Sequence, residues 1–149
     1  MKISSLIKRN VISCTIHDDL QRAAQLMWDH DIGCLPVIDA QGHVVGMITD
    51  RDICMAAYTQ GVPLQALPVT LAMAKRVFAC SANDEVAAVE RRMSEHQVRR
   101  MPVIDDQGHP VGIVSLNDIA RAASAGQVPA SEVTSTMTAV SAPRPIASA

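Results

Sequence analysis

Two short polar motifs in this sequence pair a hydroxyl with a carboxylate at a spacing that suits phosphate and ribose chemistry. Thr49 is followed three residues later by Asp52, and Ser115 is followed at the same spacing by Asp118. Each motif lies between an apolar run and a segment of helical character. A helix N-terminus presents unpaired N–H groups and a partial positive charge, which suit a phosphate. An aspartate three residues further on can accept both hydroxyl groups of a ribose.

The same spacing has a second explanation that needs no ligand. Ser or Thr followed three residues later by an acidic residue is close to the capping box, which satisfies the first N–H groups of a helix. The two roles are compatible, because a capping group can be shared with a ligand or displaced by it. Spacing alone therefore leaves both helix capping and ligand binding open for the two motifs.

The motifs belong to an internal duplication. Shifted by 66 residues, positions 11–57 align with positions 77–123 without a gap, and 18 of these 47 positions are identical. The strongest shared block reads Pro-Val-Ile-Asp-x-Gln-Gly-His, at 36–43 and 102–109. Two copies are too few for a long solenoid or a propeller.

Each copy predicts the same order of elements: strand, helix, strand, strand, helix. Asp18 and Asp84 stand where a helix N-cap belongs, and apolar residues at helical spacing follow each of them. Two apolar runs joined by a turn that ends in glycine predict a β-hairpin. The expected segments are lead strands at 11–16 and 77–80, hairpins at 35–48 and 101–114, and closing helices at 50–58 and 116–124.

A copy of this size is too small to bury enough apolar surface alone. Two sheets that pack face to face solve the problem, and the duplication supplies the second sheet. We therefore expect an α+β fold of two β-α-β-β-α repeats, packed sheet to sheet with pseudo-twofold symmetry and with clefts where the repeats meet. The expected parts are repeat 1 at 1–60, a linker at 61–76, repeat 2 at 77–124 and a C-terminal tail at 125–149.

The element order, the Pro-Val-Ile-Asp block and the closing Gly-hydrophobic-hydrophobic-Ser/Thr-x-x-Asp sequence together resemble the cystathionine-β-synthase (CBS) domain. The pair resembles the arrangement called a Bateman module, over residues 7–123. The resemblance implies a non-catalytic regulatory module that needs no cofactor and binds an adenine-containing ligand such as AMP, ADP, ATP or S-adenosylmethionine. It also implies a homodimer and an unidentified regulated protein.

Residues outside the motifs are expected to complete the two pockets. Arg99 and Arg100 precede the second hairpin and suit a phosphate, whereas the matching positions 33 and 34 carry no charge. The pocket of Ser115 and Asp118 is therefore expected to prefer a phosphorylated ligand, with Arg51 as partial compensation in the other. The alternative is that the adjacent arginines are a solvated strand end.

The resemblance also implies where adenine is held, because the lead strand of one repeat often lines the pocket of the other. By position, Ile12 and Ser13 would line the second pocket, and Phe78 and Ala79 would line the first.

Composition argues against several other classes of protein. The net charge of −2 and the aromatic content of 2% do not fit a nucleic-acid reader. The sequence has neither a run of 18 apolar residues nor a leader with a cleavage site, so we expect no membrane association and a cytoplasmic location. Helical faces that carry Met27 with Trp28, and Met93, are expected to form the dimer interface.

The remaining chemistry-bearing residues do not suggest catalysis. We expect the four cysteines to be small buried hydrophobes, since they form no Cys-x-x-Cys pair, and we expect no metal site. Nucleophile–base constellations and phosphate-loop motifs are not recognisable, so an enzyme is disfavoured. Two alternatives stay open: a ligand-free dimerisation or protein-interaction scaffold, and a redox sensor, which would need an accessible thiol of lowered pKa.

Overall fold

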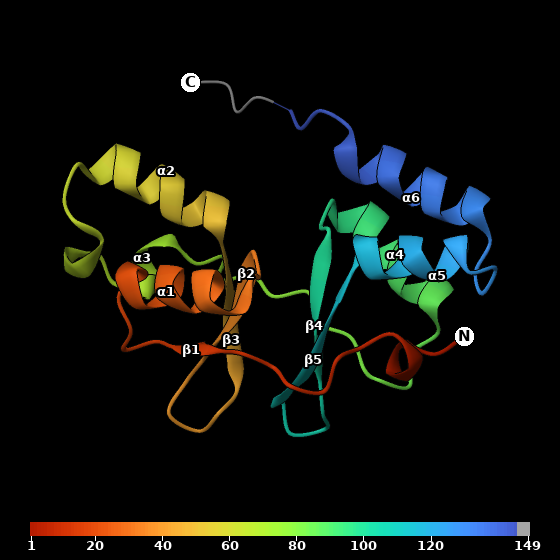
Figure 1. Ribbon diagram of the computed structural model, residues 1–149, viewed down its shortest axis with the longest axis horizontal. Helices are drawn as coiled ribbons and strands as arrows, with labels where there is room; N and C mark the ends of the chain where they lie inside the picture. The colour runs from red at the N-terminus through yellow and green to blue at the C-terminus, as the bar shows by residue number, and fades with distance from the viewer. Residues whose placement is uncertain (146–149) are drawn as a thin grey trace. The chain divides into compact units, whose positions relative to one another are not determined.

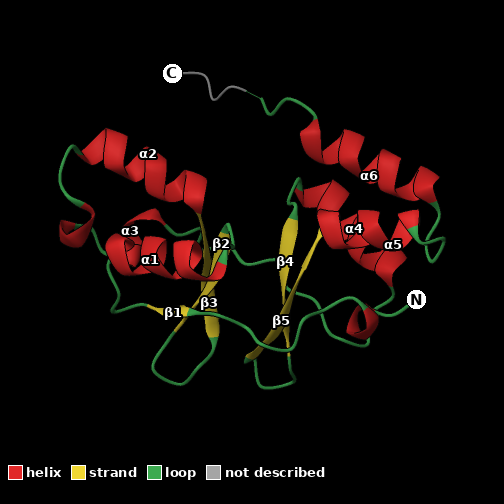
Figure 2. Cartoon of the chain, in the orientation of Figure 1, coloured by secondary structure: helices red, strands yellow, loops and turns green. Residues whose placement is uncertain are grey.

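The computed structural model describes residues 1–145 and divides into two compact units. The first unit comprises residues 9–77 with 104–111, and the second comprises residues 1–8, 78–103 and the described residues from 112. Helices and strands occur together in the chain (Figures 1 and 2), so the predicted α+β class is confirmed. Each hairpin is followed directly by a helix, as the duplicated sequence predicts.

The first unit is built on a three-stranded sheet in the order β1-β2-β3. Strand β1 pairs parallel with β2, and β2 pairs antiparallel with β3. Lead strand β1 is shorter than the predicted 11–16. The elements are β1 (Cys14–Thr15), α1 (Leu20–His30), β2 (Cys34–Ile38), β3 (Val44–Thr49), α2 (Asp50–Gln60), the 3-10 turn η2 (Leu64–Ala66) and α3 (Val69–Ala72).

Apolar side chains from α1 and the sheet form the core of this unit. Leu20, Leu35 and Ile48 are fully buried, and Val69 of α3 joins them. Helix α1 buries the face that its apolar spacing predicts, and Met27 is only 6% exposed. Met93 is also fully buried, so neither methionine can lie in a dimer face, whereas Trp28, the other residue of the expected interface, is 87% exposed. A dimer face at Trp28 stays a prediction.

The turns of the two hairpins pack together within the first unit. The imidazole rings of His43 and His109 are stacked with their centroids 5.4 Å apart, and the N–H of Val44 donates to the carbonyl of Gly108 at 3.0 Å. Gly108 adopts a φ of 83°, a conformation that glycine tolerates without steric cost. In the first turn, backbone N–H donors led by that of His43 lower the pKa of Asp39.

The second unit holds η1 (Ile3–Ser5), α4 (Val86–His96), most of β4 (Arg100–Ile104) and β5 (Pro110–Ser115), α5 (Leu116–Ser124) and α6 (Ala130–Ser141). Strands β4 and β5 form a two-stranded sheet. The strand predicted at 77–80 is reduced to one bridge, in which Cys80 pairs parallel with Val103. The closing helix of this repeat has the predicted bounds.

Asp18 and Asp84 lie one residue before the helix caps, contrary to the sequence prediction. The N-cap of α1 is Asp19 and that of α4 is Glu85. Asp18 Oδ2 instead accepts a hydrogen bond from the Thr15 N–H at 2.8 Å, and Asp84 Oδ2 accepts one from Ser81 at 3.0 Å. These two aspartates therefore close the turn that leads into each helix.

Helix α6 lies inside the segment expected to be a tail, and it packs against α4 and α5 (Figure 1). Val133, Thr136 and Val140 are buried at helical spacing. Gln97, which ends α4 in the left-handed conformation, donates from Nε2 to the carbonyl of Ala139 at 3.2 Å. Residues 146–149 of the expected tail lie outside the described residues.

Helix α6 also buries a carboxylate. Glu90 of α4 is 3% exposed. Its Oε1 accepts a long hydrogen bond of 3.4 Å from Thr136 Oγ1, while Oε2 has no hydrogen-bond partner among the described residues. Burial raises the pKa of Glu90, and the neighbouring charge of Glu132 raises it further.

This burial predicts a pH-dependent stability. A folded-state pKa above the unfolded value of about 4.3 means that the contribution of Glu90 is complete below that pH and is lost as pH rises through the folded pKa. Glu90→Gln should therefore unfold at higher urea concentration than wild type at pH 8, with a gain of about 1 kcal/mol that shrinks toward pH 4. Glu95→Gln, an exposed change on the same helix, is the control. A gain at pH 4 as large as that at pH 8 would contradict the interpretation.

Candidate functional site

Thr49 and Asp52 form a complete capping box at the start of α2. Thr49 Oγ1 accepts from the Asp52 N–H at 3.1 Å, and the Thr49 N–H donates to Asp52 Oδ2 at 2.9 Å. The next residue, Asp50, donates its N–H to the carbonyl of Gly33 at 3.1 Å. Asp52 is half-buried, and no hydrogen bond to its Oδ1 is found within residues 1–145.

Ser115 and Asp118 form the same capping box at the start of α5. The Ser115 N–H and Oγ both donate to Asp118 Oδ2, at 2.8 and 2.6 Å, and the Asp118 N–H donates back to Ser115 Oγ at 3.2 Å. The other oxygen of Asp118 forms an ion pair with Arg121. Both motifs therefore cap helices. The carboxylate of Asp118 makes more hydrogen bonds and ion pairs than that of Asp52.

The two predicted arginines lie with Ser115 around a small hollow of 160 Å³ in the second unit. The Leu116 N–H donates to the Arg99 carbonyl at 2.8 Å, which places the start of β4 beside the start of α5. Sequence reasoning missed the contribution of α6 to this hollow. The lining residues are Arg99, Arg100, Ser115, Leu116, Asn117, Met137 and Ser141.

Asp118 lines a different hollow, of 240 Å³, together with Ser5, Leu6, Arg121, Ala122 and Gln127. Its carboxylate turns back onto the amide of Ser115, as the capping box requires, whereas the arginines lie with the serine in the other hollow. The structure thus groups Ser115 with Arg99 and Arg100, and it does not place Asp118 in the hollow that they share.

The predicted adenine-binding residues lie in separate units. Ile12 and Ser13 are half-buried residues before β1, and Ile12 packs against the core of the first unit. Phe78 and Ala79 belong to the second unit. The Phe78 ring is stacked on His96, with the ring centroids 3.9 Å apart. Arg51 is exposed on the first turn of α2.

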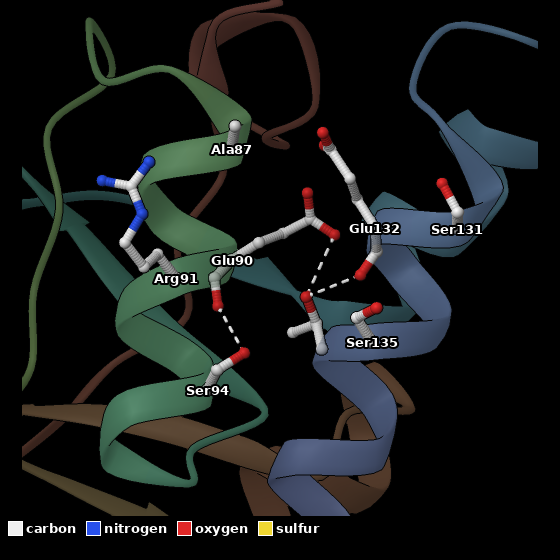
Figure 3. Close-up of a pocket in the computed structure, with 8 residues that line it drawn as sticks. Ala87, Glu90, Arg91, Ser94, Ser131, Glu132 and Ser135 are labelled. Atoms are coloured by element: carbon white, nitrogen blue, oxygen red, sulfur yellow. Dashed lines mark hydrogen bonds between the residues drawn. The ribbon is translucent and has the colours of Figure 1, made fainter.

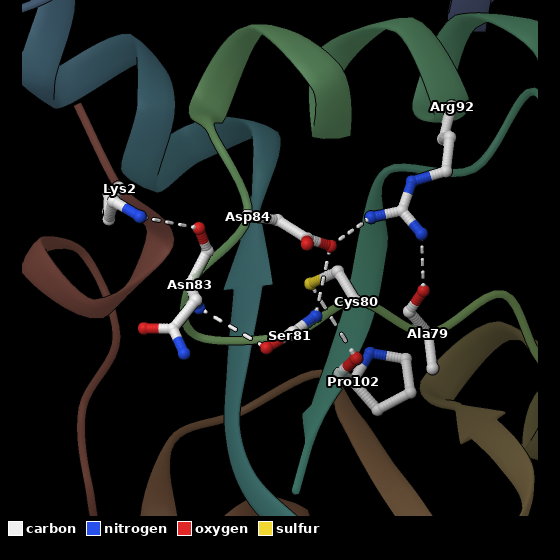
Figure 4. A network of polar contacts seen from close by, with 8 residues as sticks. All are labelled: Lys2, Ala79, Cys80, Ser81, Asn83, Asp84, Arg92 and Pro102. Atoms are coloured by element: carbon white, nitrogen blue, oxygen red, sulfur yellow. Dashed lines mark hydrogen bonds and ion pairs between the residues drawn. The ribbon is translucent and has the colours of Figure 1, made fainter. Parts of the chain in front are cut away.

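A polar network fixes the backbone at Ala79 (Figure 4). Arg92 Nη1 donates to the Ala79 carbonyl at 2.9 Å, and Arg92 Nη2 forms an ion pair of 2.5 Å with Asp84. Part of this network is visible in the duplication, because Asp84 matches Asp18 in the first repeat. Arg92 aligns with Leu26, so this network is found in the second repeat alone among the described residues.

The environments of Cys14 and Cys80 argue against a redox role for these two thiols. Cys14, Cys34 and Cys80 are buried, as predicted, whereas Cys54 is exposed. Burial, with the charge of Asp18, raises the pKa of Cys14 to about 12. Burial also raises the pKa of Cys80 to about 11. Neither thiol has the lowered pKa that a reactive thiolate requires.

Residues 1–145 offer neither a cluster of metal ligands nor a helix that could span a membrane. Groups of three or more His, Cys, Asp or Glu side chains that could hold a metal ion do not occur there. The helices in that range are too short or too polar to cross a membrane.

The chain matches known proteins over most of its length. The family model described as "CBS domain" matches residues 3–58 and 68–125. The CBS domain-containing protein YhcV of Bacillus subtilis is 35% identical over 118 residues, which cover 79% of this chain and 82% of YhcV. Hypoxic response protein 1 of Mycobacterium tuberculosis is 38% identical over 105 residues, or 70% of this chain and 73% of that protein.

Two further matches bear on ligands and on catalysis. The CBS domain pair of protein MJ0100, solved in complex with 5′-methylthioadenosine and S-adenosyl-L-methionine, superposes with a TM-score of 0.78 and 26% identity, covering 85% of this chain and 98% of that one. The L-aspartate semialdehyde sulfurtransferase of Methanocaldococcus jannaschii is 28% identical over 119 residues, which cover 80% of this chain but only 22% of the enzyme.

The capping boxes predict a measurable effect on stability. Ser115→Ala removes the hydroxyl that accepts from the Asp118 N–H, so it should lower the free energy of unfolding by about 1 kcal/mol, and Thr49→Ala should do the same. Urea unfolding measures both. Ser124→Ala, which removes a hydroxyl from the last turn of the same helix as Ser115, should cost less. Equal losses for Ser115→Ala and Ser124→Ala would show that capping is not the reason.

Proposed function

Because the chain belongs to the CBS-domain family, as a tandem pair, we propose that it is a non-catalytic regulatory module that binds adenosine-type ligands at the starts of α2 and α5. The observation that carries the proposal is the duplicated helix start, in which a hydroxyl, a carboxylate and helix N–H groups occur together. The complex of the MJ0100 pair with methylthioadenosine and S-adenosylmethionine supports the ligand class.

The second site is proposed to take a phosphorylated ligand. Arg99 and Arg100 flank Ser115 around one hollow, at the N-terminus of a helix. Guanidinium groups and the helix dipole both favour an anion there. The ribose would be held by Asp118, whose carboxylate would have to exchange part of its hydrogen bonding to Ser115 or Arg121 for the ligand.

The first site is proposed to take an adenosine ligand without phosphate, such as S-adenosylmethionine. Positions 33 and 34 offer glycine and cysteine where the second repeat has its two arginines. Asp52 keeps an oxygen that accepts no hydrogen bond within residues 1–145, and this oxygen can receive a ribose hydroxyl. Arg51 on the same turn is exposed and can reach a carboxylate of the ligand.

The adenine contacts of the proposal follow the family pattern. Ile12 and Ser13 would line the second site, and Phe78 and Ala79 would line the first. Phe78 already carries an aromatic neighbour on one face, since it is stacked on His96. The Arg92 network holds the Ala79 carbonyl in place, which would give an adenine ring a fixed backbone edge to contact.

A ligand-free scaffold is the second candidate, and one observation favours it. The first unit exposes large apolar side chains on its helices, with Trp28 at 87%, Tyr58 at 83% and Leu71 at 51%. Where such side chains gather into one patch, they mark a protein-binding surface. Homodimerisation, a regulated partner protein and a cytoplasmic location belong to the proposal in either case.

Thermal unfolding against AMP, ADP, ATP, adenosine and S-adenosylmethionine separates the two candidates. A ligand at 100 times its Kd adds about 2.7 kcal/mol and raises the Tm by several degrees. We expect such a shift, with the AMP response abolished by Asp118→Ala and the S-adenosylmethionine response abolished by Asp52→Ala. Asp106→Ala, an exposed change in a turn, is the matched control.

An arginine substitution tests the proposed phosphate contact separately from the adenosine contacts. Arg100→Ala should weaken AMP binding by about tenfold and leave adenosine binding within about twofold, because only AMP carries a phosphate. A Tm that does not change with any of the ligands would reject the sensor and favour the scaffold.

A further inference from the structure

A groove of 350 Å³ runs between α4 and α6 in the second unit (Figure 3). None of the residues of the two capping boxes and neither Arg99 nor Arg100 lines it. Its lining comes from two helices alone, and each lining residue except Ala87 has a polar or charged side chain. The lining residues are Ala87, Glu90, Arg91, Ser94, Ser131, Glu132, Ser135 and Thr136.

One wall of the groove carries a buried carboxylate oxygen without a partner. Glu90 is 3% exposed, and its Oε2 has no hydrogen-bond partner among the described residues. Native proteins pair nearly all buried polar atoms, so an orphaned carboxylate oxygen calls for an explanation. In Figure 3 the side chain of Glu90 extends from α4 toward α6, into the space between the helices.

The charges around Glu90 favour a cationic ligand. Glu132 contributes a second carboxylate from the opposite helix. Burial raises the pKa of Glu90, and the charge of Glu132 raises it further. Arg91 supplies the positive charge of the lining, but its side chain points away from Glu90 in Figure 3, and no ion pair between the two is found within residues 1–145. A bound cation would relieve the repulsion between the two carboxylates.

The opposite wall offers hydroxyl groups. Ser131 and Ser135 stand one helical turn apart on α6, and neither hydroxyl makes a hydrogen bond to another described residue. Thr136 is different, because its hydroxyl already donates to the Glu132 carbonyl at 2.9 Å. Two unengaged hydroxyls that line the same groove as two carboxylates match a ligand that has both hydroxyl and ammonium groups.

We propose that this groove binds a small hydroxylated primary amine, of the amino-sugar or amino-alcohol class. Its ammonium group donates to Glu90 Oε2 and to the carboxylate of Glu132, and its hydroxyl groups bond to Ser131 and Ser135. The volume of 350 Å³ suits a small organic molecule better than a bare ion, since a water molecule occupies about 30 Å³. A cluster of three acidic or imidazole ligands for a metal ion is not present in residues 1–145.

The groove is a property of the second repeat. Glu90 aligns with Ala24 and Ser94 aligns with Trp28 in the first repeat. These two side chains that α4 contributes to the groove therefore have no polar counterpart there. Helix α6, which supplies the other wall, follows the part of the chain that matches the CBS-domain model. The proposed amine site is thus separate from the adenosine sites, and a test of one does not decide the other.

Isothermal titration with D-glucosamine and ethanolamine tests the proposal, with D-glucose and ethylene glycol as neutral analogues. We expect saturable binding of the two amines, with one molecule per chain, and no detectable binding of the neutral compounds. Glu90→Gln should weaken amine binding at least tenfold. Glu95→Gln removes the same charge from an exposed position of α4 and should leave binding within twofold.

The double variant Ser131→Ala with Ser135→Ala keeps the carboxylates and changes only hydroxyls on the surface of α6. It should weaken the binding of D-glucosamine more than that of ethanolamine, because the sugar has more hydroxyl groups that can lose hydrogen bonds to the serines. Failure of both amines to bind wild type at millimolar concentration would overturn the proposal. Equal binding of D-glucose and D-glucosamine, or unchanged binding by a folded Glu90→Gln variant, would overturn it as well.

Discussion

The structure depends on a pair of reciprocal hydrogen bonds at the start of each closing helix. A helix begins with N–H groups that have no partner within the helix, and the capping box satisfies two donors at once. Thr49 with Asp52, and Ser115 with Asp118, do this at the point where a hairpin strand turns into a helix. The first residue of each helix, Asp50 or Leu116, donates its N–H to the carbonyl of the residue just before the hairpin's first strand. The capping box and this hydrogen bond together tie both ends of each hairpin to one helix start.

This constraint explains why charged side chains gather at one of these points. The hydrogen bond from Leu116 to the Arg99 carbonyl holds the arginine pair beside Ser115. In the first repeat the same bond runs from Asp50 to Gly33, and no arginine is brought to the helix start by it. The two repeats thus share a backbone arrangement and differ in the side chains attached to it. Arg92 in place of Leu26, and Glu90 in place of Ala24, extend that difference to α4.

The sequence predicted what depends on local pattern. The hairpins and the closing helices were predicted because apolar alternation, turn glycines and caps act over a few residues. The lead strands were predicted too long, since pairing of Cys14 and Cys80 depends on partners distant in sequence. Helix α6 was missed although Val133, Thr136 and Val140 have helical spacing, because its Ser-, Thr- and Ala-rich composition is typical of a tail.

The candidate site was predicted in part for the same reason. Ser115, Arg99 and Arg100 are brought together by a hairpin and its helix, a local arrangement that the sequence indicates. The separation of Asp118 into another hollow depends on the direction of one side chain, which spacing does not determine. The groove at Glu90 could not be predicted, because it exists only where α6 packs on α4.

Amide NMR spectra during titration with AMP or S-adenosylmethionine test the central claim most directly, because they locate the ligand as well as detect it. We expect AMP to shift the backbone amide resonances of Ser115, Asp118 and the first turn of α5. We expect S-adenosylmethionine to shift those of Thr49, Asp52 and the first turn of α2. Resonances at these helix starts that stay in place, while the ligand either fails to bind or shifts amides elsewhere, would contradict the claim.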